Sequence, residues 1–513
     1  MLRLPRMIGP ILVVLGMAGA SREEEPWRLR METREPGGRR VTTPVAIDPA
    51  KTAILVVGVE DAHWCKTFDA RVANLIPRLN RTLAAARGAG IPVIFVRSVI
   101  LDQDRNSPQY LAMRAAKPVV PPVGRAPEIA PLSWSRTGGC ECGPDLSCAR
   151  RHVESRPNRN LGIAPADLIA DGDDVGTLYG FCRARKIDTL IYSGVALNMA
   201  VADCGVGIRA MRSAGLRTLF FDDLVVAISG NGYDPDKQLR DDSFTPALGT
   251  ATVARELELA GVGSLETRRW LEVATGGPAD ARPHAVCVLA DDEYETERTV
   301  PEFFRERMSG WRVTVLTPDP GDRNVVPGLD AVADADVVVL SMRRRFLSAA
   351  SMDHLERYLR AGKPLVAIRL GISPFAVGSG LKPVAPGQVV WQRFDRDALG
   401  CDYQMYDPAA RKTGSDVAVL PSAREHPILA GLDAAGWHTT SWIYRVNPLA
   451  VSATPFLEGR WAASKEVHPV AWVNRPEGAR IFYTCLGHPD DFKLEVFRLL
   501  LANALKWTVN VSP

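Results

Sequence analysis

Short apolar runs alternate along this chain with longer segments in which apolar residues recur at helical spacing. In the first half, the continuous apolar runs predict buried strands at residues 51–59, 92–98, 189–195 and 217–222. The amphipathic segments between them predict helices at residues 71–88, 176–185 and from about 198 to 214. Strands that alternate with helices in this way indicate a parallel, doubly wound sheet.

A second series of the same kind follows a stretch rich in glycine and proline at residues 275–283. It predicts further strands at residues 284–290, 311–316, 335–341, 364–369 and 480–485, and helices at 300–308, 347–362 and 492–507. The predicted fold class is therefore α/β, with two doubly wound, mostly parallel three-layer α/β/α domains in tandem. We place them at residues 44–263 and 283–508, with a linker at 264–282 and a flexible, charged lead-in at 21–43.

The first twenty residues have the pattern of an export signal. Arg3 and Arg6 precede an apolar run at 7–18, and small residues at 18–20 supply a cleavage pattern. We expect cleavage near Ala20 and a periplasmic or extracellular protein; an N-terminal core helix is the alternative. The run is too short to span a membrane, and no later apolar stretch approaches ~20 residues.

Composition describes an ordinary globular protein, with 46% hydrophobic and 24% charged residues among 513. Removal of residues 1–20 takes away two arginines and no acid, which leaves 60 basic against 59 acidic residues. So balanced a charge gives no electrostatic argument for nucleic acid or anionic lipid as a partner. A small-molecule or carbohydrate ligand and a homo-oligomer stay open.

Three of the nine cysteines, Cys140, Cys142 and Cys148, cluster in a glycine-rich loop, with His152 close behind. In an exported protein a disulfide that involves Cys148 is the favoured interpretation. A zinc ion held by the three cysteines and His152 is the weaker one, because the spacing matches no established zinc pattern. No cofactor is predicted.

The stretch at 190–201, Leu-Ile-Tyr-Ser-Gly-Val-Ala-Leu-Asn-Met-Ala-Val, leads from an apolar strand into a helix. Such a junction is where open α/β sheets place reactive groups. Together with Ala-Ile-Leu-Val-Val-Gly-Val-Glu-Asp at 53–61, it makes residues 44–263 resemble the isochorismatase-like cysteine hydrolases. That resemblance implies an Asp, a Lys and a Cys as catalytic set. Here Gly58 and Ala200 stand at the Asp and Cys positions, and no lysine lies between Lys117 and Lys186.

Two other thiols are candidate substitutes for the missing nucleophile. Cys65 follows His63 by two residues, and a Cys–His pair is a legitimate nucleophile and base. Cys204 lies one helical turn beyond Ala200. For each, simple packing is the alternative, with a disulfide as a further one for Cys65. Asp61 and Asn198 are the candidate ligand-binding residues of this domain.

The second domain resembles the trehalose-utilisation-type (ThuA-like) domains, which share the class I glutamine-amidotransferase-like fold. The resemblance rests on Asp-Glu-Tyr-Glu-Thr at 292–296, Ala-Gly-Lys-Pro-Leu-Val-Ala-Ile-Arg at 361–369 and Leu-Gly-His-Pro-Asp-Asp-Phe at 486–492. It implies a role in sugar metabolism. Two histidine-bearing stretches of the family are changed, and no Gly-x-Ser/Cys-x-Gly elbow is present. The candidate ligand-binding residues are Glu293, Tyr294, Arg369, Tyr403, His488 and Asp491, and nearby aromatic residues such as Trp442 offer faces for sugar rings.

The first hypothesis is therefore an exported pseudoenzyme: a first domain without its hydrolase chemistry, which binds a small ligand or acts as a scaffold, beside a ThuA-like domain with a carbohydrate-related role. The alternative is an active hydrolase that uses Cys65 or Cys204, or a site around His488.

Overall fold

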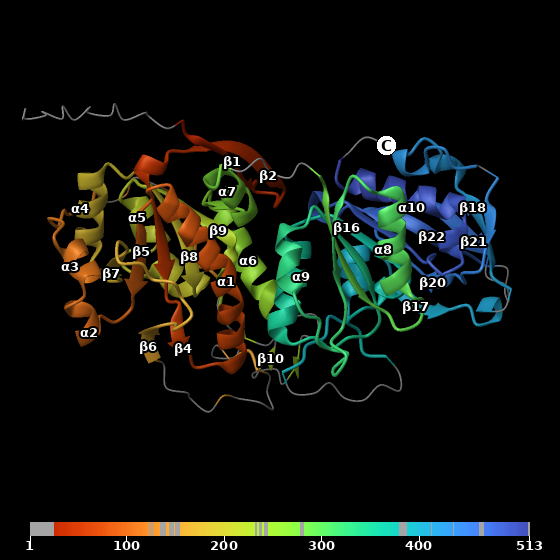
Figure 1. Ribbon diagram of the computed structural model, residues 1–513, viewed down its shortest axis with the longest axis horizontal. Coiled ribbons are helices and arrows are strands. Elements are labelled where there is room, and N and C mark those ends of the chain that lie inside the picture. The colour runs from red at the N-terminus through yellow and green to blue at the C-terminus, as the bar shows by residue number, and fades with distance from the viewer. Residues whose placement is uncertain are drawn as a thin grey trace, which may run out of the picture.

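The computed structural model describes residues 25–510 except 123, 125–126, 134–139, 143–147, 149–153, 231–232, 235–238, 241–244, 277–281, 379–386, 412, 434 and 461–465. The proposed signal peptide lies outside the described residues and stays a prediction. Two α/β domains lie side by side, each built around its own sheet (Figure 1).

The first sheet has the strand order β2-β1-β12-β9-β8-β3-β5-β7. Its bounds are β1 Trp27–Arg34, β2 Arg40–Ile47, β3 Thr52–Val57, β5 Val93–Arg97, β7 Leu168–Asp171, β8 Thr189–Val195, β9 Arg217–Val226 and β12 Gly263–Leu265. The strands from β12 to β7 are parallel, whereas β1 pairs antiparallel with both β12 and β2. The parallel strands confirm the doubly wound prediction for this domain.

Helices cover both faces of this sheet. They are α1 Lys66–Gly88, α2 Asp102–Arg105, α3 Pro108–Arg114, α4 Val175–Arg185, α5 Ile208–Ser213, α6 Pro246–Leu259 and α7 Thr267–Ala274. Along β3, Ile54 and Val56 pack in the cluster that includes α1, whereas Leu55 and Val57 pack in the cluster that includes α4. This alternation is the two-residue period of a strand buried on both faces. The short pairs β4 Glu60–Ala62 with β6 Glu154–Pro157, and β10 Tyr233–Asp234 with β11 Leu239–Arg240, lie outside the main sheet.

Most of the segment predicted as a flexible lead-in at 21–43 forms strands, namely residues 27–34 and 40–43, whereas residues 21–24 lie outside the described part of the chain. β1 pairs with β2 along its whole length and extends the sheet. Its charged residues alternate with Leu29, which is buried, and Met31, which packs on the same core, so one face is apolar. Arg34 pairs with Glu258 at 2.8 Å, and Arg40 pairs with Glu32. The high charge of the segment obscured its period of two.

The linker predicted at 264–282 is also too long. Its first part contains β12 and α7, which belong to the first domain. Trp270 of α7 is fully buried, with its ring 5.3 Å from that of Phe221 and 4.8 Å from that of Trp27. The apolar face of α7 is narrow and lies between charged residues, so the sequence pattern did not reveal this helix. The glycines at 276 and 277 mark the end of the first domain better than the start of α7 does.

The second sheet has nine strands in the order β14-β13-β15-β16-β23-β22-β21-β18-β19. Their bounds are β13 His284–Ala290, β14 Arg312–Leu316, β15 Val337–Met342, β16 Leu365–Ile368, β18 Ser415–Val419, β19 Trp437–Thr439, β21 Ala453–Arg460, β22 Val467–Asn474 and β23 Ile481–Thr484. The strands from β14 to β23 are parallel, and the remaining pairs are antiparallel. The sheet is therefore mixed, and only its parallel half was predicted as strands.

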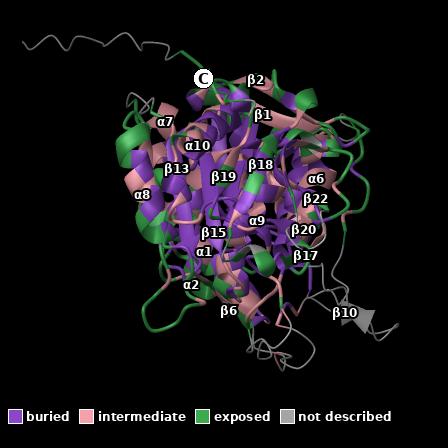
Figure 2. Ribbon diagram, turned by 90° about the vertical axis from the view of Figure 1, so that its right-hand side faces the viewer, coloured by how far each residue is buried: buried purple, intermediate pink, exposed green. Residues whose placement is uncertain are grey.

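Three helices, α8 Thr296–Arg307, α9 Ala349–Arg360 and α10 Glu495–Thr508, flank this sheet, and a small pair, β17 Tyr403–Tyr406 with β20 Tyr444–Val446, lies at its edge. Figure 2 shows buried strands between helices whose outer surfaces are exposed. Within the described part of the chain, no helix is both long and apolar enough to cross a membrane.

The two domains meet where α9 packs against α1 and α6 (Figure 1). Arg71 of α1 is fully buried there and donates to Asp353 of α9 at 2.8 Å. Arg78 pairs with Asp334 at 2.9 Å, and Arg268 pairs with Asp336 at 2.8 Å. Arginines of the first domain thus face aspartates of the second across a partly buried interface.

Candidate functional site

The expected catalytic turn of the first domain lies at the carboxyl ends of β3 and β8. Gly58 follows β3 with a φ of +63°, and a Cβ atom placed on it would lie 2.2 Å from the carbonyl oxygen of Val195. Real Cβ atoms do not approach an oxygen so closely. In this backbone, position 58 has room for a hydrogen only, and the carboxylate of the hydrolase family has no place there.

The turn after β8 is held by Asn198. Its side-chain amide donates to the carbonyls of Ile228 at 2.9 Å and Ser133 at 3.0 Å, and its oxygen accepts from the Ile228 amide at 3.0 Å. The turn continues as a π-helix at Leu197–Val201 and not as one long helix, which corrects the prediction for 198–214. Ala200 lies in this π-helix, and residues 195–201 carry no hydroxyl, thiol or carboxyl group. Asn198 therefore has a structural role at a turn without a nucleophile.

His63 and Cys65 do not face each other. The His63 ring lies with Nδ1 3.0 Å from the Asp69 carboxylate and Nε2 3.1 Å from the Gly58 carbonyl. Cys65 is fully buried at the start of α1, where its sulfur accepts from the Phe68 amide. Burial raises the pKa of Cys65, which disfavours the nucleophilic thiolate.

Cys204 packs against the core on the α4 side of the sheet, and burial raises its pKa to about 11. At neutral pH it is a thiol, as a small apolar side chain in a core would be. Asp61 lies on β4, where Arg159 binds its carboxylate at 3.3 Å. Neither Cys204 nor Asp61 supplies the nucleophile or the base that the turn lacks.

Cys65 instead meets the glycine-rich loop. Its sulfur lies 3.6 Å from that of Cys142, whose sulfur lies 3.3 Å from that of Cys148. Burial tends to raise the pKa of Cys142, but hydrogen bonds from Thr67, Cys148 and Cys65 together outweigh that and lower the pKa to about 7. Cys140 belongs to the same group. His152 lies outside the described residues. The sequence contained no signal for the approach of Cys65, because it precedes the loop by 75 residues.

In the second domain, the loops after β13, β16 and β23 bring three predicted residues together. The guanidinium of Arg369, fully buried, lies 4.3 Å from the ring of Tyr294 and 4.5 Å from that of Trp442. The ring of His488 lies 6.2 Å from that of Tyr294 and 6.3 Å from that of Trp442. This group of four residues, the Arg369 cluster, lies at the carboxyl edge of parallel strands, where α/β proteins bind ligands.

Arg369 is only partly satisfied by the protein. Its Nη1 donates to the carbonyls of Cys485 at 2.6 Å and Trp442 at 3.0 Å. Its Nε and Nη2 have no hydrogen-bond partner among the described residues. A buried guanidinium normally has its donors paired, so the aromatic faces carry much of its stabilisation.

Two aspartates hold the loops of the cluster. Asp491 accepts from Ser441 Oγ at 2.5 Å and from the amides of Gly487 and His488 at 2.8 and 3.1 Å. Asp291 accepts from the amides of Glu293 and Tyr294, both at 2.9 Å. Asp491 is therefore a positioning residue, and Asp291 performs the equivalent role without having been predicted.

The remaining predicted residues lie around this cluster. Glu293 forms an ion pair with Arg343, and the Tyr403 ring lies 5.3 Å from that of Tyr444. Burial lowers the pKa of His488, and the positive charge of Arg369 lowers it further. His488 is therefore neutral at pH 7, with its Nδ1 3.1 Å from the hydroxyl of Thr440.

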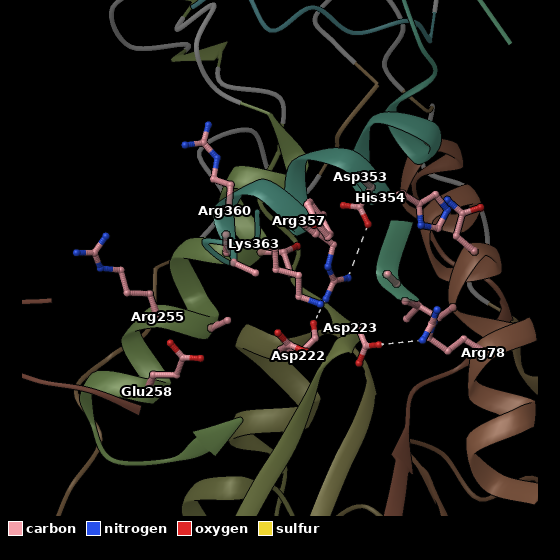
Figure 3. A pocket seen from close by; sticks show the side chains of 18 of the residues that line it. Arg78, Asp222, Asp223, Arg255, Glu258, Asp353, His354, Arg357, Arg360 and Lys363 are labelled. Carbon is pink, nitrogen blue, oxygen red and sulfur yellow. Dashed lines mark hydrogen bonds and ion pairs between the residues drawn. The ribbon is translucent and has the colours of Figure 1, made fainter. Parts of the chain in front are cut away.

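A cavity of about 100 Å³ lies between the domains (Figure 3). Its lining includes seven basic side chains and five acidic ones, from α1, α6 and α9 among other elements. Figure 3 shows Arg357 lying between Asp353 and Asp222, and Arg78 directed at Asp223. Sequence analysis did not identify this cavity, because its walls come from both domains. Its described charges are largely paired with one another, so it forms part of the interface.

Comparison with known proteins separates the two halves of the chain. Residues 286–508 match the ThuA family model, described as trehalose utilisation. This part of the chain is a ThuA domain. A curated protein, the ureidoacrylate amidohydrolase RutB of Methylobacterium radiotolerans, is 26% identical over 183 residues, which cover 31% of this chain and 61% of RutB. The chain thus spans less than two thirds of the relative that it matches.

Solved structures also resemble each half. A ThuA-like protein from Parabacteroides merdae is 12% identical, with 44% of this chain and 90% of that protein covered and a TM-score of 0.32. A cysteine hydrolase from Pseudomonas syringae pv. phaseolicola is 21% identical, with 36% and 75% covered and a TM-score of 0.23. Residues 286–508 thus match the ThuA model, and part of the first half resembles an amidohydrolase, in agreement with the two resemblances that the sequence motifs indicate.

Proposed function

We propose that this is an exported two-domain protein whose isochorismatase-like domain does not hydrolyse amides and whose ThuA domain binds a sugar or sugar derivative. The observation that carries the loss of hydrolysis is the position of the Val195 carbonyl oxygen, 2.2 Å from where a Cβ atom on residue 58 would lie. Hydrolysis through a covalent intermediate needs a base and a nucleophile. Position 58 has no room for the base, and position 200 holds an alanine.

Relocated thiols are weak substitutes. The pKa of Cys65 and that of Cys204 are both raised by burial, so neither thiol is ionised at neutral pH. His63 is directed at Asp69 and Gly58 and not at a thiol. The first domain therefore has a structural role, because it supplies Arg71, Arg78 and Arg268 to the interface with the ThuA domain.

The sugar-binding part of the proposal rests on the Arg369 cluster. Aromatic faces beside hydrogen-bonding groups are the usual components of a sugar site. Trp442 and His488 are half-buried and flank the buried Arg369, whose Nε and Nη2 have no partner among the described residues. A ligand that bears a carboxylate or phosphate would satisfy those donors better than a neutral sugar. The family description, trehalose utilisation, supports a sugar-related ligand in general, whereas the preference for an acidic one rests on the two donors of Arg369.

Amide hydrolysis is tested with the purified full chain against ureidoacrylate, simple amides and esters. The proposal expects no turnover above buffer from the wild type or from a Cys65→Ala/Cys204→Ala variant. Turnover that disappears in the double variant would establish a relocated thiol nucleophile. Turnover that persists in it would move the chemistry elsewhere in the chain and would also overturn the proposal.

Sugar binding is tested by calorimetry with trehalose, glucose and glucuronate. We expect binding of glucuronate to exceed that of glucose, and Trp442→Ala to weaken it by about tenfold, or about 1.4 kcal/mol. The matched control is Trp437→Ala, which removes another half-buried tryptophan of the same domain and should leave the affinity within about twofold. Equal losses in both variants, or no binding of any of the three, would contradict the assignment.

Export is tested by fractionation. Expression of the full chain in a bacterial host should give a periplasmic or secreted product that begins near residue 21, as intact mass would show. A cytoplasmic product with residues 1–20 still attached would contradict it.

A further inference from the structure

Four cysteine sulfurs converge beside the start of α1. Cys65 precedes that helix, and Cys140, Cys142 and Cys148 belong to the loop above it. All four sulfurs lie within 4.8 Å of one another. We propose that these four thiolates bind one Zn²⁺ ion as a tetrahedral structural site, the cysteine site, which is independent of the function proposed above.

The spacing of the sulfurs fits that ion. A tetrahedral zinc with bonds of about 2.3 Å places its ligand sulfurs about 3.8 Å apart. The Cys142 sulfur lies 3.6 Å from that of Cys65 and 3.3 Å from that of Cys148. A disulfide joins one sulfur to one partner at about 2.05 Å, whereas Cys142 approaches two sulfurs from different segments. Sulfurs from different segments that lie this close together have the arrangement of ligands around one metal ion.

Three of these sulfurs accept hydrogen bonds from neighbouring donors. Cys65 Sγ accepts from the backbone amides of Glu141 at 3.2 Å and Phe68 at 3.5 Å. Cys148 Sγ accepts from the Lys66 amide at 3.2 Å, and Cys142 Sγ accepts from the Thr67 hydroxyl at 3.3 Å. Ligand thiolates are stabilised by such donors around a metal ion.

The N-terminus of α1 would also stabilise the net negative charge of four thiolates on one zinc ion. Cys65 is the N-cap residue of α1, which runs for 23 residues from Lys66 to Gly88. The amides of its first turn carry the positive end of the helix dipole, and two of them donate to ligand sulfurs. The helix end alone would not define a site; the four convergent sulfurs do.

The cysteine site is connected to the interface between the domains. Glu141 lies between two of the ligands, and its carboxylate accepts from Arg71 Nη1 at 2.7 and 2.9 Å. Arg71 also donates to Asp353 of α9 at 2.8 Å. A zinc ion bound by Cys140 and Cys142 would therefore fix the position of Glu141, so that its carboxylate stays in contact with Arg71. The inferred role of the ion is to stabilise this loop and, through it, the domain contact.

Metal analysis of the purified full chain tests the inference. After loading with zinc chloride and dialysis against metal-free buffer, we expect about one zinc per chain by mass spectrometry of the elements. Cys142→Ser and Cys148→Ser, at half-buried positions, should lose the ion, and the control Cys204→Ser should retain it. Cobalt in place of zinc should give the intense visible absorption of a tetrahedral thiolate complex. Chelation should lower the melting temperature of the wild type and of Cys204→Ser, but not that of the two variants that have lost the ion.

Other outcomes would overturn the zinc site. Two disulfides among the four cysteines would lower the intact mass by about 4 Da and leave no metal bound. Iron in place of zinc, or four thiols that bind neither zinc nor cobalt, would also refute it. The wild-type measurement decides the matter even if a serine variant fails to fold, and circular dichroism identifies that case.

Discussion

Restoring the carboxylate of the hydrolase family at position 58 should damage the fold. Gly58→Asp, alone or with Ala200→Cys, places a Cβ atom where the carbonyl oxygen of Val195 lies 2.2 Å away. That oxygen belongs to the backbone at the end of β8 and cannot rotate aside as a flexible side chain could. The strands β3 and β8 are hydrogen-bonded neighbours up to Val57 and Gly194, so separating their ends would break this pairing.

The magnitude follows from two costs. A left-handed φ of +63° costs a residue other than glycine about 1 kcal/mol, since aspartate tolerates this region better than most. Forcing an extra atom into a packed site adds about 1–3 kcal/mol. We therefore expect a loss of about 2–4 kcal/mol, or a fall in melting temperature of roughly 5–15 °C for a domain of this size. Gly58→Ala should lose almost as much, because the contact involves the Cβ atom.

Gly90→Asp is the matched control. Gly90 also has a positive φ, +71°, but no atom lies within 4 Å of a Cβ placed there. It should lose only the backbone cost, about 1 kcal/mol. Urea unfolding of the full-length variants measures both. The reasoning is refuted if Gly58→Asp is as stable as Gly90→Asp, and more strongly if Gly58→Asp/Ala200→Cys folds normally and hydrolyses amides.

Three further variants test the interface, the turn and a half-buried histidine. Arg71→Met leaves Glu141 buried without its cation and Asp353 with only the longer pair to Arg357 at 3.7 Å, and should cost about 3–5 kcal/mol in urea unfolding. Asn198→Ala removes three hydrogen bonds from the turn after β8 and should cost about 2–3 kcal/mol, measured in the same way. His354→Gln should alter the pH dependence of stability, because burial lowers the pKa of His354 in the folded protein. The unfolded chain then binds the proton first, so the stability of the wild type relative to the variant should fall as the pH drops below about 6.5.

Each of these three predictions has a result that would contradict it. Arg305→Met, at an exposed position on α8, should change stability by less than about 0.5 kcal/mol, and an Arg71→Met loss as small as that would remove the buried pairing argument. An Asn198→Ala variant as stable as the wild type would show that the turn does not need these bonds. Parallel stability curves for wild type and His354→Gln between pH 8 and pH 5 would contradict the assigned direction of the pKa shift.

Individual residues of the candidate site could be predicted from local motifs, but their contacts with distant residues could not. The identities of Gly58 and Ala200 were readable because each lies within a recognisable strand or turn. Tyr294, Arg369 and His488 were identified because each belongs to a motif that resembles those of ThuA-like domains, and His488 also follows a predicted strand. The approach of Cys65 to the loop cysteines depends on contacts that no local pattern encodes. So does the position of Arg369 Nε and Nη2, which have no hydrogen-bond partner in the described part of the chain.

The sequence by itself determined the α/β class, the two domains and the absence of the hydrolase residues. Those features depend on the apolar period within single elements and on the residue type at single positions. Only the tertiary structure decided that β1 and β2 extend the first sheet, that Val195 fills the space beside Gly58, and that four sulfurs meet beside α1. These outcomes depend on strand order and on the docking of segments far apart in the chain. A period of two or of 3.6 residues reports which face of an element is buried and carries no information about which distant segment buries it.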